Sequence, residues 1–100
     1  SERDFQENVF RIVRQFNQQA AKMNIVAKTD LTAERRFEVA RRLYLMGKSS
    51  ILDLNSATSE KDAARRNHIT ALRNYWSLYY TLRSLTGYDF ERGREIEWEK

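Results

Sequence analysis

The chain has 100 residues, which allows at most one domain with a modest hydrophobic core. It contains no cysteine, which excludes disulfides, thiol nucleophiles and cysteine-based zinc sites, and it has no proline and only three glycines. Alanine, leucine, arginine, glutamate and glutamine are plentiful, so the composition predicts an all-α fold. No apolar run approaches the roughly 20 residues that a membrane-spanning helix needs.

The formal net charge of +4 raises the question of an acidic partner such as nucleic acid or a lipid surface. Residues 1–28, 29–48 and 49–86 each carry five basic and three acidic groups, whereas residues 87–100 carry three basic and five acidic groups. We therefore expect the excess positive charge to be spread along the chain, followed by an acidic tail.

In the first arm, apolar side chains recur three or four residues apart, which is typical of one face of an α-helix. Their mean step exceeds 3.5 residues, closer to an eleven-residue than to a seven-residue repeat, and this predicts weak supercoiling. Residues 29–32 could start a separate helix, but neither proline nor glycine enforces a break, so we expect one helix over about 4–46. The stripe consists of Phe5, Val9, Ile12, Phe16, Ala20, Met23, Ala27, Leu31, Phe37, Ala40 and Leu43.

The chain must turn near Gly47, because this is the only glycine within the amphipathic region and glycine readily takes a positive φ. Ser50 and Asp53 then form an S-x-x-D pattern that would cap a second helix. We expect this helix over 50–86, because Thr86 and Gly87 offer a stop signal. Its inward positions are predicted to be Leu54, Ala57, Ala64, His68, Leu72, Tyr75 or Trp76, Tyr79 and Leu82.

These elements predict a long antiparallel, coiled-coil-like hairpin over residues 1–86. An acidic C-terminal tail is expected over 87–100, with no clear periodicity apart from Ile96 and Trp98. A turn near residue 48 places residue i of the first arm roughly level with residue 96 minus i of the second. Phe16 would then lie level with Tyr79 and Tyr80. Arms of about 40 residues would be on the order of 60 Å long. One hairpin covers one stripe on each helix, so self-association into a helical bundle, with a homodimer as one form, is expected.

Several groups of residues have a functional and a structural interpretation, and the structural one is favoured for each. The aromatic cluster of the second arm suits a core at the open end of the hairpin better than a stacking platform for bases. His68 is the only histidine, so we expect an ordinary surface histidine and no metal site. Glu34 and Glu38 stand beside arginines and are expected to be solvated charges. The arginine pairs at 35/36, 41/42 and 65/66 favour salt bridges over phosphate contacts. No motif indicates an enzyme or a cofactor.

Part of the sequence resembles the TolC-like family of outer-membrane efflux channels. The resemblance lies in the residues from Tyr44 to Ala57, in the alanine-containing polar helix that follows, and in Tyr75 and Leu85-Thr86-Gly87. The pattern shared with that family is Tyr-x-x-Gly, a short polar turn, a helix led by Asp and an apolar residue, and a Leu-Thr-Gly ending about thirty residues after the alanine. The forms Gln15-Phe16-Asn17, Tyr79-Tyr80 and Gly87-Tyr88-Asp89-Phe90 look like the variant found in Bacteroidetes bacteria.

The resemblance implies that these residues form the C-terminal periplasmic helical hairpin of a longer channel subunit, which assembles as a homotrimer in the bacterial outer membrane. The tip would dock a periplasmic adaptor protein of an inner-membrane transporter, and the residues that match this docking tip are Tyr44, Leu45, Met46, Gly47, Lys48 and Ser49. Asp53 matches an acidic position that constricts the tunnel entrance. The family often has arginine where Ser49 stands and a second acidic residue where Ser56 stands, so the constriction would carry less charge here.

Two other functions remain open from the residues alone. The first is a basic helical module that binds nucleic acid through its arginine pairs. The second is a free-standing helical scaffold or dimerisation domain that has no role in transport.

Overall fold

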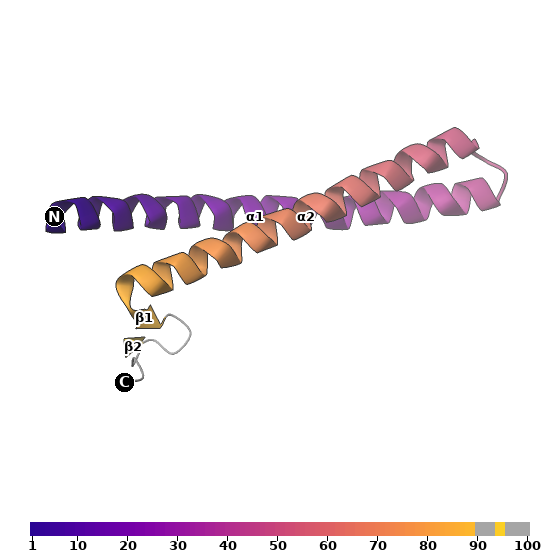
Figure 1. Ribbon diagram of the computed structural model, residues 1–100. Helices are drawn as coiled ribbons and strands as arrows, with labels where there is room; N and C mark the ends of the chain where they lie inside the picture. The colour runs from indigo at the N-terminus through magenta and orange to yellow at the C-terminus, as the bar shows by residue number, and fades with distance from the viewer. Residues whose placement is uncertain (90–93, 96–100) are drawn as a thin grey trace.

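The computed structural model describes residues 1–89 and 94–95, and its main feature is a pair of long antiparallel helices (Figure 1). Helix α1 spans Glu2–Leu45 and helix α2 spans Ile51–Thr86. The predicted all-α hairpin is confirmed, and each helix boundary lies within two residues of its expected position. The longest dimension of the chain is 66 Å, in agreement with the length expected from the number of residues.

Helix α1 passes through residues 29–32 without a break. Thr29 does not cap a new helix; its hydroxyl donates a hydrogen bond of 3.0 Å to the carbonyl of Ile25, one turn earlier in the same helix. The alternative of three helices is therefore wrong, and the rod is built from two helices alone along residues 2–86.

The two helices meet along a seam in which inward side chains recur with alternating steps of three and four residues. Such spacing is a seven-residue repeat, the pattern of a left-handed coiled coil. Every seam residue is buried or half-buried: Val9, Ile12, Phe16, Gln19, Met23, Val26, Asp30, Ala33, Phe37 and Ala40 from α1, and Leu54, Ala57, Lys61, Ala64, His68, Ala71, Tyr75, Leu78, Leu82 and Leu85 from α2.

This seam corrects the predicted apolar stripe at several positions. Leu31 is 48% exposed and Phe5 is also exposed, whereas Asp30 is buried in the seam. On α2, Leu72 is exposed and Ala71 takes its place. The predicted stripe took steps of four residues from Phe16 to Ala20 and from Met23 to Leu31, where the seam includes steps of three, so it drifted towards an eleven-residue repeat. The actual repeat is seven residues, and it admits polar and small side chains.

Aromatic packing joins the arms towards their open end. The ring of Phe16 lies 5.0 Å from that of Tyr75 and 6.4 Å from that of Tyr79, measured between centroids. The predicted facing of Phe16 and Tyr79 is confirmed, as is the core interpretation for Tyr75 and Tyr79, which are half-buried and buried. Trp76 and Tyr80 contact Tyr79 edge to face but remain exposed.

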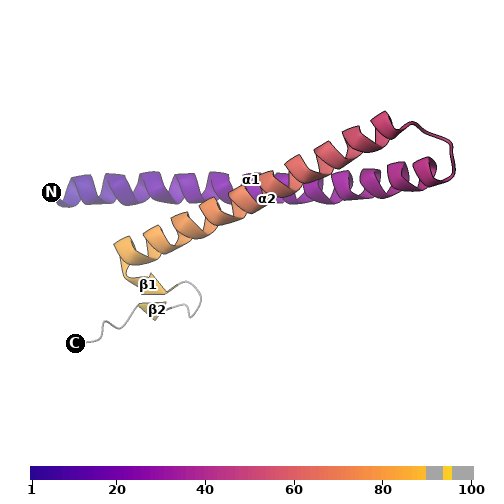
Figure 2. The same ribbon diagram turned by 45° about the vertical axis from the view of Figure 1, so that its right-hand side comes forward.

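The middle of the seam is lined by small side chains. Ala33, Ala64 and Ala71 are all buried, and side chains of this size let two helix backbones approach closely. In both ribbon views α2 crosses α1 obliquely near the middle of the hairpin (Figure 2). The middle of the hairpin is therefore packed through alanine.

Helix α2 ends at Gly87, which has a φ of 66° and donates its N–H to the carbonyl one turn back, as the predicted stop signal requires. Two short strands follow, β1 (Tyr88–Asp89) and β2 (Arg94–Glu95), and they pair antiparallel. The sequence pattern predicted no strand here. The rest of the acidic tail, including Ile96 and Trp98, lies outside the described residues.

Candidate functional site

The tip of the hairpin is a tight turn in which the backbone satisfies its own hydrogen-bonding groups. Helix α1 ends at Leu45, and Gly47 takes a φ of 71°. The N–H of Gly47 donates to the carbonyl of Tyr44 (3.0 Å), and the N–H of Lys48 donates to the carbonyl of Leu43 (2.8 Å). These two bonds form a Schellman motif, so Gly47 is the pivot that the sequence predicted.

Helix α2 begins directly after this turn, at Ile51. Ser50 has extended backbone angles, and its hydroxyl accepts a hydrogen bond of 3.3 Å from the N–H of Asp53. This is the N-cap that the S-x-x-D pattern predicted. The carboxylate of Asp53 lies in the first turn of α2, where the helix dipole stabilises negative charge.

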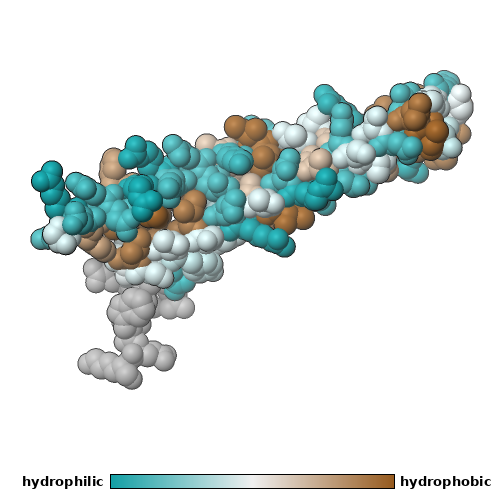
Figure 3. Space-filling model, turned by 45° about the horizontal axis from the view of Figure 1, so that its top comes forward, coloured by the Kyte–Doolittle hydropathy of each residue, from teal (hydrophilic) through white to brown (hydrophobic). Residues whose placement is uncertain are grey.

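The tip exposes a cluster of large apolar side chains to solvent. Leu45 is 68% exposed, Met46 is 59% exposed and Leu52 is 72% exposed, and they are flanked by exposed Tyr44 and Ile51. Hydrophobic side chains gather visibly at this end of the rod in the space-filling view (Figure 3). Apolar surface gathered at one end of a rod is typical of a protein contact surface.

The predicted docking residues lie together on this turn, but their environments differ. Lys48 is exposed, whereas the hydroxyl of Ser49 is covered and has no hydrogen-bond partner among the described residues. A covered hydroxyl without a partner is uncommon in folded proteins, because it loses its hydrogen bonds to water. The tip therefore presents apolar side chains and one cation to a partner.

Asp53 and Ser56 begin an exposed stripe along α2 that contains few charges. Its members recur with steps of three and four residues, so they share one face of the helix. We call this face the polar stripe. All its members are exposed except Ala63, which is half-buried. The stripe consists of Asp53, Ser56, Glu60, Ala63, Asn67, Thr70, Asn74, Ser77, Thr81 and Ser84. It has no basic residue and no large apolar residue.

Two shallow hollows lie beside the polar stripe where it meets α1. Residues of the stripe share one hollow with Thr29, Thr32 and Arg36, and share the other with Gln18 and Lys22. This side of the hairpin is therefore lined mainly by hydroxyl, amide and charged groups.

The opposite side of the hairpin is apolar towards its open end. The ion pair between Glu34 and Arg65, with atoms 3.5 Å apart, marks the side of the seam opposite the polar stripe. The helix faces that carry Glu34 and Arg65 become apolar towards the open end. Their exposed apolar residues there are Phe10, Val13, Leu31, Ile69, Leu72 and Trp76. The hairpin thus separates a mainly polar surface from one that is apolar towards the open end.

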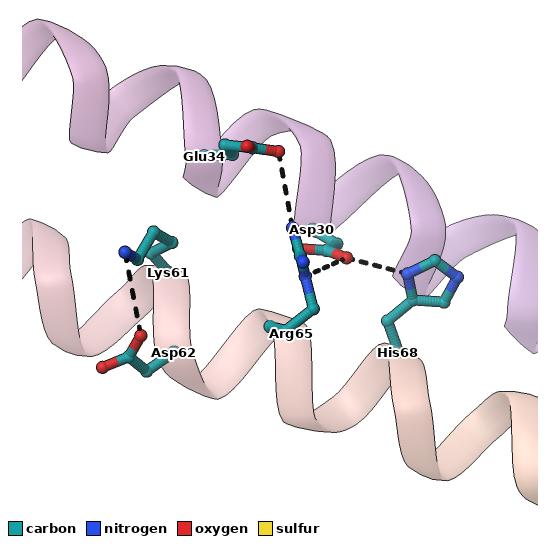
Figure 4. Close-up of polar contacts among 6 residues, drawn as sticks. All are labelled: Asp30, Glu34, Lys61, Asp62, Arg65 and His68. Carbon is teal, nitrogen blue, oxygen red and sulfur yellow. Dashed lines mark hydrogen bonds and ion pairs between the residues drawn. The ribbon is translucent and has the colours of Figure 1, made fainter.

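Asp30 is the buried centre of a polar network that the sequence did not predict (Figure 4). Its side chain is 8% exposed, and the Nε of Arg65 donates to both carboxylate oxygens at 3.1 and 3.0 Å. The Nδ1 of His68 lies 2.8 Å from Oδ2 of the same carboxylate. Arg65 also reaches Glu34, so three charged side chains and the histidine link the two helices.

His68 takes the inward position predicted for it, but it is not the ordinary surface histidine also expected, because it is half-buried in the seam and contacts Asp30. Arg65 forms its salt bridges across the hairpin, because α1 supplies a buried carboxylate. The ion pair within α1 between Glu38 and Arg41 is present at 3.4 Å. The signal for the network in the sequence was the seven-residue phase, which places both Asp30 and His68 in the seam.

The hydrogen bond from His68, the bonds from Arg65 and their charges lower the pKa of Asp30 below its ordinary value of 3.8, against the opposing effect of burial. The hydrogen bonds from Arg65 to Asp30 and the negative charges of Asp30 and Glu34 raise the pKa of Arg65. Both shifts favour the charged forms, so the network holds an ionised pair between the helices.

Acid is expected to weaken the hairpin as Asp30 becomes protonated. Because the pKa of Asp30 is lower in the folded chain, its contribution to stability is fully present above pH 3.8 and is lost as the pH falls through the folded-state pKa. Denaturant unfolding of the wild type and of Asp30→Asn, at neutral pH and from roughly pH 4 to 2, measures this. The wild type should have a higher free energy of unfolding than Asp30→Asn at neutral pH, and this difference should shrink only in the acidic range. A difference that stays constant with pH would contradict the role given to Asp30. The charged and titratable groups around Asp30 are Arg65, His68 and Glu34.

In comparisons with known proteins, no family model, curated protein or solved structure matches this chain. None of the described helices is long and apolar enough to cross a membrane. In the part of the chain that the structure describes, no three His, Cys, Asp or Glu side chains gather closely enough to hold a metal ion.

Proposed function

We propose that this chain is the periplasmic hairpin of a trimeric outer-membrane efflux channel subunit, and that its tip docks a periplasmic adaptor of an inner-membrane transporter. The observation that carries the proposal is the exposed apolar tip, in which Leu45, Met46 and Leu52 surround a turn locked by Gly47. The residues of this turn are also those that carry the resemblance to the TolC-like family. A tip of this kind suits end-to-end contact with another helical hairpin.

The two sides of the hairpin support the same role. Small polar side chains suit the wall of a water-filled tunnel, and most residues of the polar stripe from Asp53 to Ser84 are of this kind. The apolar side towards the open end suits packing against neighbouring helices of a channel wall. Repeated around a threefold axis, Asp53 would form a ring of negative charge near the tunnel entrance that attracts cations. Ser56, one turn further along the stripe, is uncharged, so this ring would carry less negative charge than a ring with two acidic residues per subunit.

Charges placed on the apolar tip are expected to abolish export while the trimer stays intact. The variant Leu45→Asp/Met46→Asp of the full-length channel removes the apolar contact and should weaken adaptor binding by about tenfold or more, because buried apolar anchors dominate most interfaces. Export of a fluorescent substrate, adaptor binding and the oligomeric state of the purified channel are the measurements.

The matched control adds the same charge beside the tip without removing apolar surface. Asn55 and Ser59 are exposed on α2, and Asn55→Asp/Ser59→Asp should leave adaptor binding close to that of the wild type. Normal export by an intact trimer carrying Leu45→Asp/Met46→Asp would remove the docking assignment.

A second candidate function, binding of nucleic acid, is favoured by one observation. Four exposed basic residues recur at seven- or fourteen-residue intervals on the outward face of α1, namely Arg14, Lys28, Arg35 and Arg42. The basic charge is therefore more localised than its distribution along the sequence indicated. Binding of the isolated chain to a short duplex that weakens with salt would support this function, and the absence of binding at low salt would end it.

A further inference from the structure

The alanine-lined middle of the seam specifies the pairing of the two helices only weakly. Alanine occupies equivalent seam positions at 33 and 40 in α1, and at 57, 64 and 71 in α2. Ala33 and Ala64 line the same hollow between the helices. If α2 slid by seven residues, roughly 10.5 Å along α1, alanine would again lie opposite alanine over part of the seam. Packing of such similar side chains distinguishes poorly between the two registers.

The second polar contact of the seam does not remove this ambiguity. Gln19 donates a hydrogen bond of 3.0 Å to the backbone carbonyl of Ala71. Every residue of α2 carries a backbone carbonyl, so a slipped α2 would offer an equivalent acceptor.

The network around Asp30 is specific to one register. Its buried carboxylate accepts hydrogen bonds at both oxygens from Arg65, and His68 contacts one of these oxygens. A slip of seven residues in one direction would bring Leu72 and Tyr75 to the positions that Arg65 and His68 occupy. Asp30 would then be a buried carboxylate without cationic partners, which is strongly unfavourable.

A slip in the other direction would also damage the network. Thr58 and Lys61 would replace the two partners, so one ammonium group would stand in for a guanidinium and an imidazole. Lys61 would also leave its position over the ring of Phe37, where its nitrogen lies 4.0 Å from the ring centroid.

We propose that the Asp30–Arg65–His68 network is a register lock: it selects this antiparallel pairing of α1 and α2 over pairings shifted by one seven-residue repeat. A single polar position in a coiled-coil seam is a known means of specifying register. The lock keeps the turn at Gly47 tight, because a slip would force residues of one arm into the loop. It acts within the hairpin and does not depend on the proposed transport function.

The absence of cysteine from the chain makes the register directly measurable. Three double variants report three registers with the same chemical change: Ala33→Cys/Ala64→Cys for the observed pairing, and Ala33→Cys with either Ala57→Cys or Ala71→Cys for the two slipped pairings. Each is oxidised in a glutathione buffer at low protein concentration, and intramolecular disulfides are quantified by mass spectrometry. In the wild-type background, we expect the 33/64 disulfide to form in large excess.

The lock is removed by Asp30→Leu/His68→Leu, which makes both seam positions apolar and is expected to preserve the helices. In this background the ratio of the 33/64 disulfide to the slipped disulfides should fall by about tenfold or more. Asp30→Asn, which keeps the side-chain shape and removes the charge, should shift the ratio in the same direction. This variant serves as a second test if the leucine variant loses helical circular dichroism.

A surface ion pair provides the matched control. Glu38→Leu/Arg41→Leu also replaces an acidic and a basic residue with two leucines, but the pair lies within α1 and links no register. This control should leave the disulfide ratio unchanged. An unchanged ratio in both Asp30 variants, with helices intact, would overturn the proposal and show that packing alone sets the register.

Discussion

Replacing Leu82 by alanine is expected to lower the free energy of unfolding of the hairpin by about 2–5 kcal/mol. Leu82 is 4% exposed and lies in the seam of α2 near the open end, where the aromatic residues also pack. Removing its branched side chain forfeits buried apolar contacts and leaves a cavity that the two helices can close only partly. Urea unfolding of the isolated chain, followed by far-ultraviolet circular dichroism at fixed concentration, measures the change.

Leu52 provides the same substitution on the surface. Because it is 72% exposed at the tip, Leu52→Ala should change the unfolding free energy by no more than about 0.5 kcal/mol. Equal destabilisation by the two alanine variants would contradict the assignment of Leu82 to the core. In the proposed channel the order of effects reverses for adaptor binding, since Leu52 belongs to the exposed tip and Leu82 does not.

The sequence predicts the ends of the two helices well, because the signals that set them are local. Gly47 and Gly87 both take the positive φ for which glycine is suited, and Ser50 caps α2 as its spacing from Asp53 indicated. These features depend on a few neighbouring residues. They can be deduced without knowing what the other helix supplies.

The seam was harder to predict because each of its positions depends on both helices. Leu31 and Asp30 are neighbours in the sequence, and their hydrophobicity alone places Leu31 inside and Asp30 outside. The structure has the reverse arrangement, because α2 supplies Arg65 and His68 as partners for the carboxylate. Periodicity within α1 contains no information about those partners.

The candidate site at the tip was predictable as a group of residues but not as a surface. The resemblance named the turn from Tyr44 to Ser49 and the acidic residue Asp53 that follows it. The extent of apolar exposure at Leu52 became apparent only when both helix ends were placed together. The polar stripe likewise emerges from the seven-residue phase, since a face can be assigned only after the seam is known.

The final prediction concerns the small side chains that let the helices approach each other. Ala71 is 2% exposed, and its backbone carbonyl accepts the hydrogen bond from Gln19. A leucine at this position would have to enter the space that the two backbones share, so the helices would separate locally and the hydrogen bond would lengthen. Ala71→Leu is therefore expected to destabilise the hairpin by about 1–3 kcal/mol, although leucine is more hydrophobic and nearly as good a helix former.

Ala21 offers the same change on a surface that meets no partner helix of the described chain, because it is exposed on α1. Ala21→Leu should alter the unfolding free energy by about 0.5 kcal/mol or less. Comparing the two variants by urea unfolding separates crowding in the seam from the intrinsic effect of leucine in a helix. If Ala71→Leu proved as stable as Ala21→Leu, the close approach of the helices at Ala71 would not be a requirement of the fold, and the seam would tolerate larger side chains where alanine now stands.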